Sequence, residues 1–152
     1  MSDVDTLRSI LTAYRQEVQP HWSPATSHPA FDGKQGDPAG QCGVTSAWAQ
    51  WKLREDHGIY ATYCVGDVFA LGKLALRDHC WLEINDGRNW LVVDLTAGQI
   101  PHVSDLSILY AAYSELRQDG IAYLYRRRFT AEQLLADPVQ ARLAILTSAV
   151  GR

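Results

Sequence analysis

Two runs of strand-forming residues, separated by an Asp-Gly dipeptide at 86–87, constrain the fold of this chain more than any other feature. Residues 79–84 and 90–95 are rich in Trp, Ile, Leu and Val. Asp-Gly between such runs is among the strongest sequence signals for a β-hairpin. A two-residue turn would place His79 directly opposite Asp94, with their Cβ atoms about 4.5–5.5 Å apart on one face of the sheet. The sequence therefore predicts antiparallel strands that bring an imidazole to a carboxylate.

A second constraint is a helix that begins with a cysteine. Apolar residues at positions 44, 47, 48 and 51 share one helical face, and His57-Gly58 is a typical helix end. The pattern predicts a helix over about 42–56. Neither Gly40 nor Gln41 is a good capping residue, so we expect the first backbone amides to be uncapped. Their partial positive charge would favour the thiolate form of Cys42.

The order Cys42, His79, Asp94 is the order expected for a thiol nucleophile, its general base and the acid that orients the base. Each residue alone is more often structural, since a free cysteine usually behaves as a small buried apolar residue. Taken together with the hairpin register, they predict a catalytic triad. Gln35 and Gln41 are candidates for donating a hydrogen bond to an oxyanion beside the cysteine.

The remaining elements are predicted from the spacing of apolar residues and from the positions of prolines, glycines and capping residues. Residues 19–41 contain four prolines and three glycines, and we expect this long irregular segment to form one wall of a cleft. Residues 66–78 are ambiguous between a short strand and a loop. The other expected elements are helices at 4–18 and 107–118, strands at 59–65 and 121–125, a helix at 130–136 capped by Thr130 and Gln133, and a last helix that starts at Asp137-Pro138.

The length of 152 residues predicts a single domain over residues 1–152. The net charge of −3 and a pI near 5.9 argue against a nucleic-acid-binding protein. No apolar run approaches the roughly 20 residues that span a bilayer, so we expect no membrane partner. The acidic start lacks the features of a signal peptide, and three cysteines do not make a disulfide framework. These observations predict a cytoplasmic protein with reduced thiols and no cofactor.

The other cysteines and histidines receive structural interpretations. Cys64 and Cys80 are expected in the core, with Cys80 facing away from His79 by strand alternation. A zinc site built from the three cysteines and His79 lacks the close ligand spacing of such sites, so no metal is predicted. The remaining histidines are expected at the surface or in loops, and they are His21, His28, His57 and His102.

The motifs of this chain resemble those of the small bacterial YunG-like proteins over nearly the whole sequence. More distantly, the chain is similar to the transglutaminase-like and papain-like cysteine enzymes, which place the cysteine at a helix start and the other triad members on adjacent strands. The motifs that carry the resemblance are Gly40-Gln41-Cys42-Gly43-Val44-Thr45, His79-x-Trp81, Asp94-Leu95-Thr96-x-x-Gln99, Trp22-Ser23-Pro24-x-Thr26-Ser27, and a tail with Arg128, Leu134-Leu135-Ala136-x-Pro138, Arg142 and Leu146.

This resemblance implies a papain-like or transglutaminase-like α+β fold, in which N-terminal helices pack on a small antiparallel sheet. By position it gives Cys42, His79 and Asp94 the roles of nucleophile, general base and orienting acid. It adds Gln99, in the loop after the aspartate, as a third oxyanion candidate. A tryptophan can serve as a helper in the transglutaminase type, which makes Trp22 a further candidate.

We therefore expect a cysteine-dependent acyl-transfer enzyme: a hydrolase, deamidase or acyltransferase that forms a thioester on Cys42 from a small-molecule or peptide amide or ester. Trp22 and Trp81 are candidates for lining its cleft. One alternative is a non-catalytic module that binds a small molecule or peptide on the same scaffold, as the aromatic segment 19–41 suggests. A third possibility is an interaction protein whose triad residues are structural.

Overall fold

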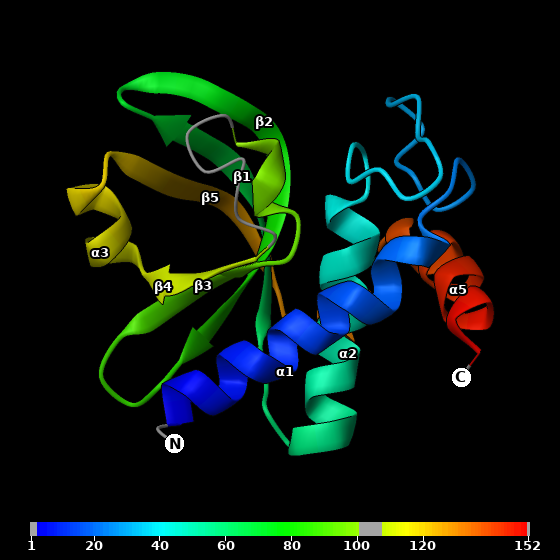
Figure 1. Cartoon of the computed structure of the whole chain (residues 1–152), viewed down its shortest axis with the longest axis horizontal. Coiled ribbons are helices and arrows are strands. Elements are labelled where there is room, and N and C mark those ends of the chain that lie inside the picture. Colours follow the sequence, from blue (N-terminus) through cyan, green and yellow to red (C-terminus); the bar gives the residue numbers. More distant parts are fainter. Residues whose placement is uncertain (1–2, 101–107, 152) are drawn as a thin grey trace.

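The computed structural model describes residues 3–100 and 108–151, and within them the chain forms an α+β structure (Figure 1). Helices and strands occur in the following order: α1 (Asp3–Val18), η1 (Gln19–His21), α2 (Cys42–His57), β1 (Thr62–Ala70), β2 (Lys73–Asn85), β3 (Trp90–Asp94), η2 (Ala97–Gln99), β4 (Leu109–Ala112), α3 (Tyr113–Gln118), β5 (Ile121–Phe129), α4 (Ala131–Leu134) and α5 (Val139–Val150).

The described strands form one antiparallel sheet in the order β4-β3-β2-β1-β5. Helices α1, α2 and α5 lie on one side of this curved sheet, and α3 lies on the other (Figure 1). Two separate clusters of buried side chains fill the two faces. Because both faces are covered, the central strand β2 carries a continuous buried run from His79 to Ile84 instead of a polar alternation.

The two helices predicted first are confirmed. Helix α1 ends at Val18, and α2 begins at Cys42 and ends at His57, followed by Gly58 in the left-handed region (φ 65°). Their apolar faces meet where the ring of Tyr14 packs edge-on against Trp48, with 5.3 Å between centroids. No side chain caps the start of α2, as the sequence indicates.

The hairpin is present, but its predicted register is wrong. A two-residue turn would pair Glu83 with Trp90, whereas the structure pairs Glu83 with Val92 and Asn85 with Trp90. The reason lies in the loop: Asp86 accepts hydrogen bonds from the backbone amides of residues 88 and 89, and its own amide donates to the carbonyl of residue 89. These bonds hold four residues in the turn. The register shifts by two positions, so every side chain keeps its predicted face.

The ambiguous stretch 66–78 is a second hairpin, longer than the first. Strands β1 and β2 pair as far as Ala70 and Lys73, and Leu71 and Gly72 form the turn between them with φ values of 52° and 80°. Two positive φ angles in succession are typical of the tight turn that matches strand twist. The predicted strand at 59–65 therefore begins later and extends further, over β1.

The predicted helix at 107–118 is wrong in its first half. Residues 109–112 form β4, which pairs with β3 from Asp94 to Leu91, and only α3 is helical. A free strand edge on β3 binds this short apolar segment, and that pairing outweighs the helical propensity of its alanines. Residue 107 lies outside the described residues. The edge strand β5 and the capping box between Thr130 and Gln133 are both confirmed.

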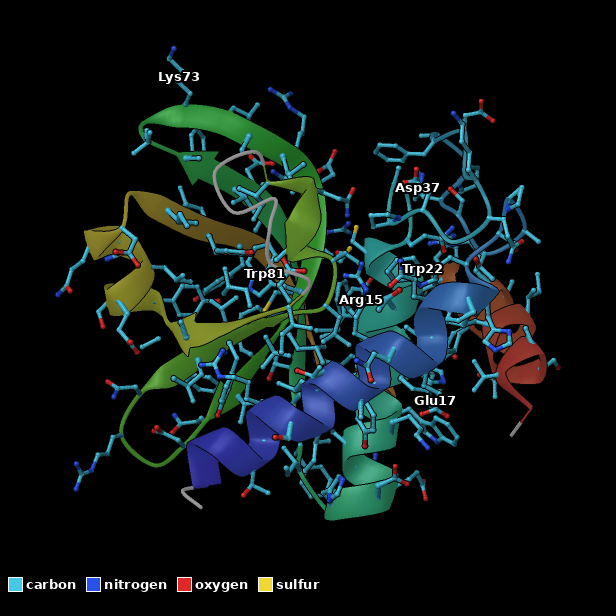
Figure 2. All side chains as sticks on the ribbon, in the orientation of Figure 1. Arg15, Glu17, Trp22, Asp37, Lys73 and Trp81 are labelled. Atoms are coloured by element: carbon cyan, nitrogen blue, oxygen red, sulfur yellow. The ribbon has the colours of Figure 1, made fainter. Side chains whose placement is uncertain are left out.

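The segment between η1 and α2 has no helix or strand, yet it is anchored (Figure 1). Trp22 is fully buried and donates through Nε1 to the hydroxyl of Thr45 at 2.8 Å, and the Arg15 guanidinium lies over its ring at 4.7 Å. Figure 2 shows Arg15 and Trp22 together on the helical side of the molecule. No helix in the described part of the chain is both long and apolar enough to cross a bilayer.

Candidate functional site

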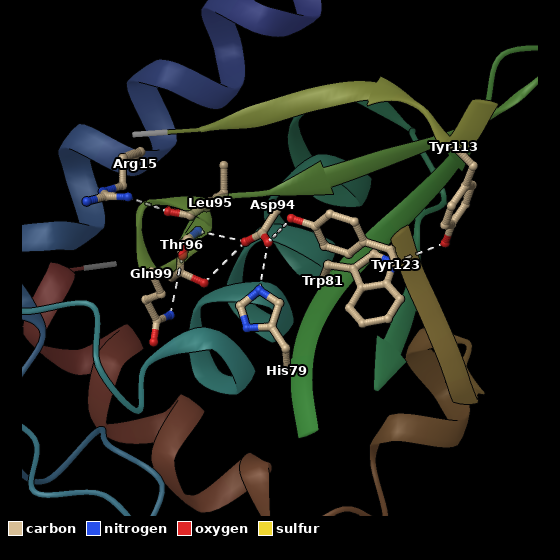
Figure 3. A network of polar contacts seen from close by, with 9 residues as sticks. All are labelled: Arg15, His79, Trp81, Asp94, Leu95, Thr96, Gln99, Tyr113 and Tyr123. Carbon is tan, nitrogen blue, oxygen red and sulfur yellow. Dashed lines mark hydrogen bonds and ion pairs between the residues drawn. The ribbon is translucent and has the colours of Figure 1, made fainter. Parts of the chain in front are cut away.

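His79 and Asp94 are in direct contact despite the corrected register (Figure 3). Their side chains remain on one face of the sheet because the shift is even, and they now lie diagonally across β2 and β3. His79 Nε2 is 2.6 Å from Asp94 Oδ2, and both side chains are almost fully buried. Diagonal neighbours on a sheet are within reach of long side chains such as imidazole. The predicted pair is therefore present, with a different strand geometry.

Asp94 is held by donors on both of its oxygens (Figure 3). The Tyr123 hydroxyl donates to Oδ2 at 2.7 Å, and the backbone amide and hydroxyl of Thr96 donate to Oδ1 at 2.9 and 3.2 Å. Burial alone would raise the pKa of Asp94, but His79 and the donated hydrogen bonds lower it below its usual value. Asp94 is therefore a carboxylate at neutral pH.

Sequence reasoning missed both residues that hold Asp94. The spacing Asp-x-Thr is a local turn pattern in which a carboxylate accepts from the amide two residues later, so Thr96 had a readable signal. Tyr123 had none. It comes from β5, two strands away from β2 across β1, and reaches Asp94 only because the sheet is curved (Figure 1).

His79 carries a proton at neutral pH. Burial alone would lower the pKa of His79, but the Asp94 carboxylate and the Cys42 thiol outweigh burial and raise it to about 10. Because Nε2 is committed to Asp94, Nδ1 is the ring nitrogen left for the thiol, and Figure 3 shows it directed away from Asp94. This imidazole is fixed in one orientation by the carboxylate.

Cys42 lies at the first position of α2, where its thiol contacts His79 and Cys80. It is partly exposed and lines a cavity of about 640 Å³. The irregular segment supplies one wall of this cavity through His28, Phe31 and neighbouring residues. Cysteine, imidazole and carboxylate therefore form one continuous chain of contacts that ends at a cavity.

Cys80 packs in the core and faces away from His79, as predicted. Its side chain joins the buried cluster on the helical side of the sheet, whereas the His79 ring packs against Trp81 and Tyr123 on the other side. The sequence did not indicate that Cys80 also lines the cavity beside Cys42, where it accepts a hydrogen bond from the Tyr63 hydroxyl at 3.3 Å.

The contact with Cys80 corrects the predicted acidity of Cys42. A depressed pKa is expected at a helix start, yet the pKa of Cys42 is raised, first by its contact with Cys80 and then by burial, although His79 acts in the opposite direction. A hydrogen bond from Cys42 lowers the pKa of Cys80 against the effect of burial, and the Tyr63 hydroxyl adds to it. Ionisation of one sulfur therefore opposes ionisation of the other, because two adjacent thiols cannot both ionise at ordinary cost.

The three candidate glutamines have their side-chain amides engaged elsewhere. Gln41 donates to the carbonyl of residue 23 at 2.9 Å, Gln35 to that of residue 20 at 2.7 Å, and Gln99 to that of residue 96 at 3.3 Å. Gln41 also accepts from the Thr26 hydroxyl and is fully buried. None of the three lines the cavity that holds Cys42. An oxyanion role for any of them stays a prediction.

The two candidate tryptophans do not line this cavity either. Trp22 anchors the irregular segment. Trp81 is fully buried on the opposite face of the sheet, where its indole stacks beside the His79 ring at 6.3 Å and donates to the Tyr113 hydroxyl at 3.0 Å (Figure 3). Trp81 therefore packs against the imidazole and restricts its movement.

Two of the other described histidines lie away from the triad, and a third lines the cavity. His21 and His57 lie at the ends of η1 and α2, and His102 lies outside the described residues. His28 lines the cavity, and its Nδ1 accepts from the amide of Ala30. Among residues 3–100 and 108–151, no group of three or more His, Cys, Asp or Glu side chains is arranged to hold a metal ion.

The His79–Asp94 pair predicts a specific pH dependence of stability. The pKa of His79 is about 10 in the folded protein and about 6.5 when unfolded, so its stabilisation is complete below about pH 6.5 and is lost as the pH rises toward 10. The pKa of Asp94 is lowered, so its contribution is present above about pH 4 and is lost on acidification. The pair should stabilise the fold most between about pH 4 and 6.5.

Urea unfolding at about pH 6 and pH 9.5 measures this effect, and we expect a loss on the order of a few kcal/mol between them. The other ionisable groups also titrate in this range, so the control is His79→Gln, which lacks the imidazole. The decline should be markedly smaller in the variant. Equal declines in both proteins would contradict a buried imidazolium.

Comparison of the chain with models of known protein families, with curated proteins and with solved structures finds no match.

Proposed function

We propose that the protein is a cysteine-dependent acyl-transfer enzyme, a hydrolase, deamidase or acyltransferase with a papain-like or transglutaminase-like fold. The observation that supports this most is the continuous chain from Cys42 through His79 to Asp94, which ends at the cavity. The helix-start cysteine and the antiparallel strands that carry the other two residues agree with the resemblance of the sequence motifs to the YunG-like proteins.

The charges suggest how the reaction proceeds. The Cys42 sulfur attacks the carbonyl carbon of an amide or ester in its thiolate form, a minor form at neutral pH because the pKa of Cys42 is raised. His79, already protonated, then gives its proton to the departing nitrogen or oxygen as the carbon–heteroatom bond breaks, leaving a thioester. Water or an amine next attacks the thioester, loses a proton to His79 and releases Cys42. The free amides of the first turn of α2 are suited to stabilise the oxyanion.

Intact-mass spectrometry of the purified protein with activated esters and peptide amides tests the proposal. We expect one acyl group on the wild type, removed by hydroxylamine as a thioester should be, and none on Cys42→Ala. Cys64→Ala is the matched control, because Cys64 is buried on the other face of the sheet and should not be needed. Absence of any adduct across the panel would instead favour the non-catalytic binding module.

A second candidate function follows from the contact between Cys42 and Cys80. Two adjacent thiols can reduce a peroxide: one thiol and hydrogen peroxide give a sulfenic acid and water, and the second thiol then forms the disulfide and releases another water. Cys80→Ala separates the two functions. Acyl transfer should survive this change and gain speed at neutral pH, because the group that raises the pKa of Cys42 is gone. Dithiol chemistry should be lost.

A further inference from the structure

The cavity around Cys42 carries positive charge from three arginines that the proposed mechanism does not use. Arg77 comes from β2, Arg127 from β5 and Arg142 from α5, and all three line it. They lie beside the start of α2, whose aligned amides add partial positive charge. The positive charges of the arginines repel the partial positive charge at the start of the helix, and a bound anion would offset this repulsion.

Arg142 is the most informative of the three. Its Nε atom is buried and has no hydrogen-bond partner among the described residues, and no ion pair of its guanidinium occurs there. Its Nη2 lies 3.6 Å from the position that a Cβ on Gly43 would occupy, which places the guanidinium one residue from Cys42. A buried guanidinium donor normally has a partner, so this one is suited to an external acceptor.

The two carboxylates that also line the cavity have other partners. Asp78 pairs with Arg126, which is outside the lining. Asp137 accepts the backbone amide of Val139 through Oδ1 at 2.9 Å, so it serves the start of α5. Neither carboxylate forms an ion pair with an arginine of the lining among the described residues, and the three guanidinium groups outnumber the two carboxylates there.

We propose that the acyl donor carries a carboxylate, which Arg142 binds next to the carbonyl that Cys42 attacks. Monoesters and monoamides of short dicarboxylic acids have this chemistry. Substrate recognition by Arg142 rests on the proposed acyl transfer. Anion binding beside Cys42, however, can be measured without turnover. A planar guanidinium matches a carboxylate in a two-bond geometry that lysine cannot reproduce.

The test compares two alkylating reagents that differ only in charge. Cys42 is treated with iodoacetate and with iodoacetamide, and the ratio of the two rates is obtained by peptide mass spectrometry. A change in thiol pKa alters both rates equally, so the ratio reports the local anion preference. We expect Arg142→Met to lower this ratio about tenfold relative to the wild type, Arg142→Lys to lower it less, and Arg88→Met, in the exposed hairpin loop, to leave it unchanged.

A second measurement guards against local misfolding of the variant. Glutarate should protect Cys42 from iodoacetamide in the wild type and should fail to protect it in Arg142→Met. Neutral glutaramide should not protect Cys42 in either protein. An unchanged reagent ratio, or equal protection by both compounds, would overturn the inference.

The two proposals fail separately. If Cys42 is acylated by neutral and carboxylate esters alike while the ratio is unaffected by Arg142, acyl transfer stands and carboxylate recognition falls. If no ester acylates Cys42 but Arg142 controls the ratio and the protection, the anion site stands and acyl transfer falls.

Discussion

Asp94→Asn should slow the acylation of Cys42 by roughly a thousandfold to ten-thousandfold. The reason is the set of donors around the carboxylate. The backbone amide of Thr96 donates to Oδ1, and an N–H group cannot act as an acceptor instead. The asparagine oxygen must therefore occupy that position. Its NH₂ group then faces His79, whose Nε2 becomes an acceptor. The proton of the neutral imidazole moves to Nδ1, facing the thiol, and the ring can no longer stabilise the thiolate or accept its proton.

The measurement is the single-turnover rate of thioester formation on each variant. Tyr123→Phe is the matched control, because it removes one donor to Asp94 and leaves the carboxylate in place. We expect at most about a tenfold effect from it. Far-ultraviolet circular dichroism checks that both variants are folded. Wild-type rates in Asp94→Asn would show that Asp94 is structural, as the interaction-protein hypothesis requires.

Gly66→Ala should destabilise the fold by roughly 3–5 kcal/mol, the largest effect on stability that we expect from one methyl group. A Cβ at this position would lie 2.1 Å from the carbonyl oxygen of Leu124 and 2.7 Å from the Cα of Tyr125. Both are backbone atoms of β5, so the overlap can be relieved only by moving a strand. Gly66 also pairs with His79 across β1 and β2.

Chemical denaturation of Gly66→Ala and Gly72→Ala measures the difference. Gly72 lies in the β1–β2 turn with open space around it and a positive φ of 80°, so alanine there costs only backbone strain, about 1 kcal/mol. The Gly66 variant should also acylate slowly, because β5 carries Tyr123 and the imidazole is close to the displaced strand. Similar stability of the two variants would show that β5 accommodates the methyl group.

The parts of this fold that follow from local chemistry are predictable from the sequence. Helix α2 begins at Cys42 and ends at His57 because its periodicity and the left-handed Gly58 that follows it are local signals. The hairpin is predictable for the same reason. Its register is not, because the side chain of Asp86 binds two backbone amides and enlarges the turn, and the strength of that competition cannot be read from an Asp-Gly dipeptide.

The parts that depend on distant strands are not predictable. Strand β4 forms because β3 offers an unpaired edge, a property of the assembled sheet. Tyr123 reaches Asp94 because of sheet curvature, and Cys80 contacts Cys42 because α2 packs on β2. The candidate triad was recoverable because an even shift of register preserves faces. The effect on the Cys42 thiol was not, since it depends on Cys80, a second sulfur that only the packing of helix on sheet brings near.

The last helix has a consequence for how the protein is made. Helix α5 packs against α2 and carries Arg142 to the cavity, while Cys42, His79 and Asp94 all precede it by more than forty positions. Because a chain leaves the ribosome from its N-terminus, Cys42, His79 and Asp94 are synthesised before Arg142. A nascent chain therefore holds the proposed nucleophile before it holds the group proposed to select its substrate. Under the two proposals, the site becomes selective only when α5 has been synthesised and has packed on α2.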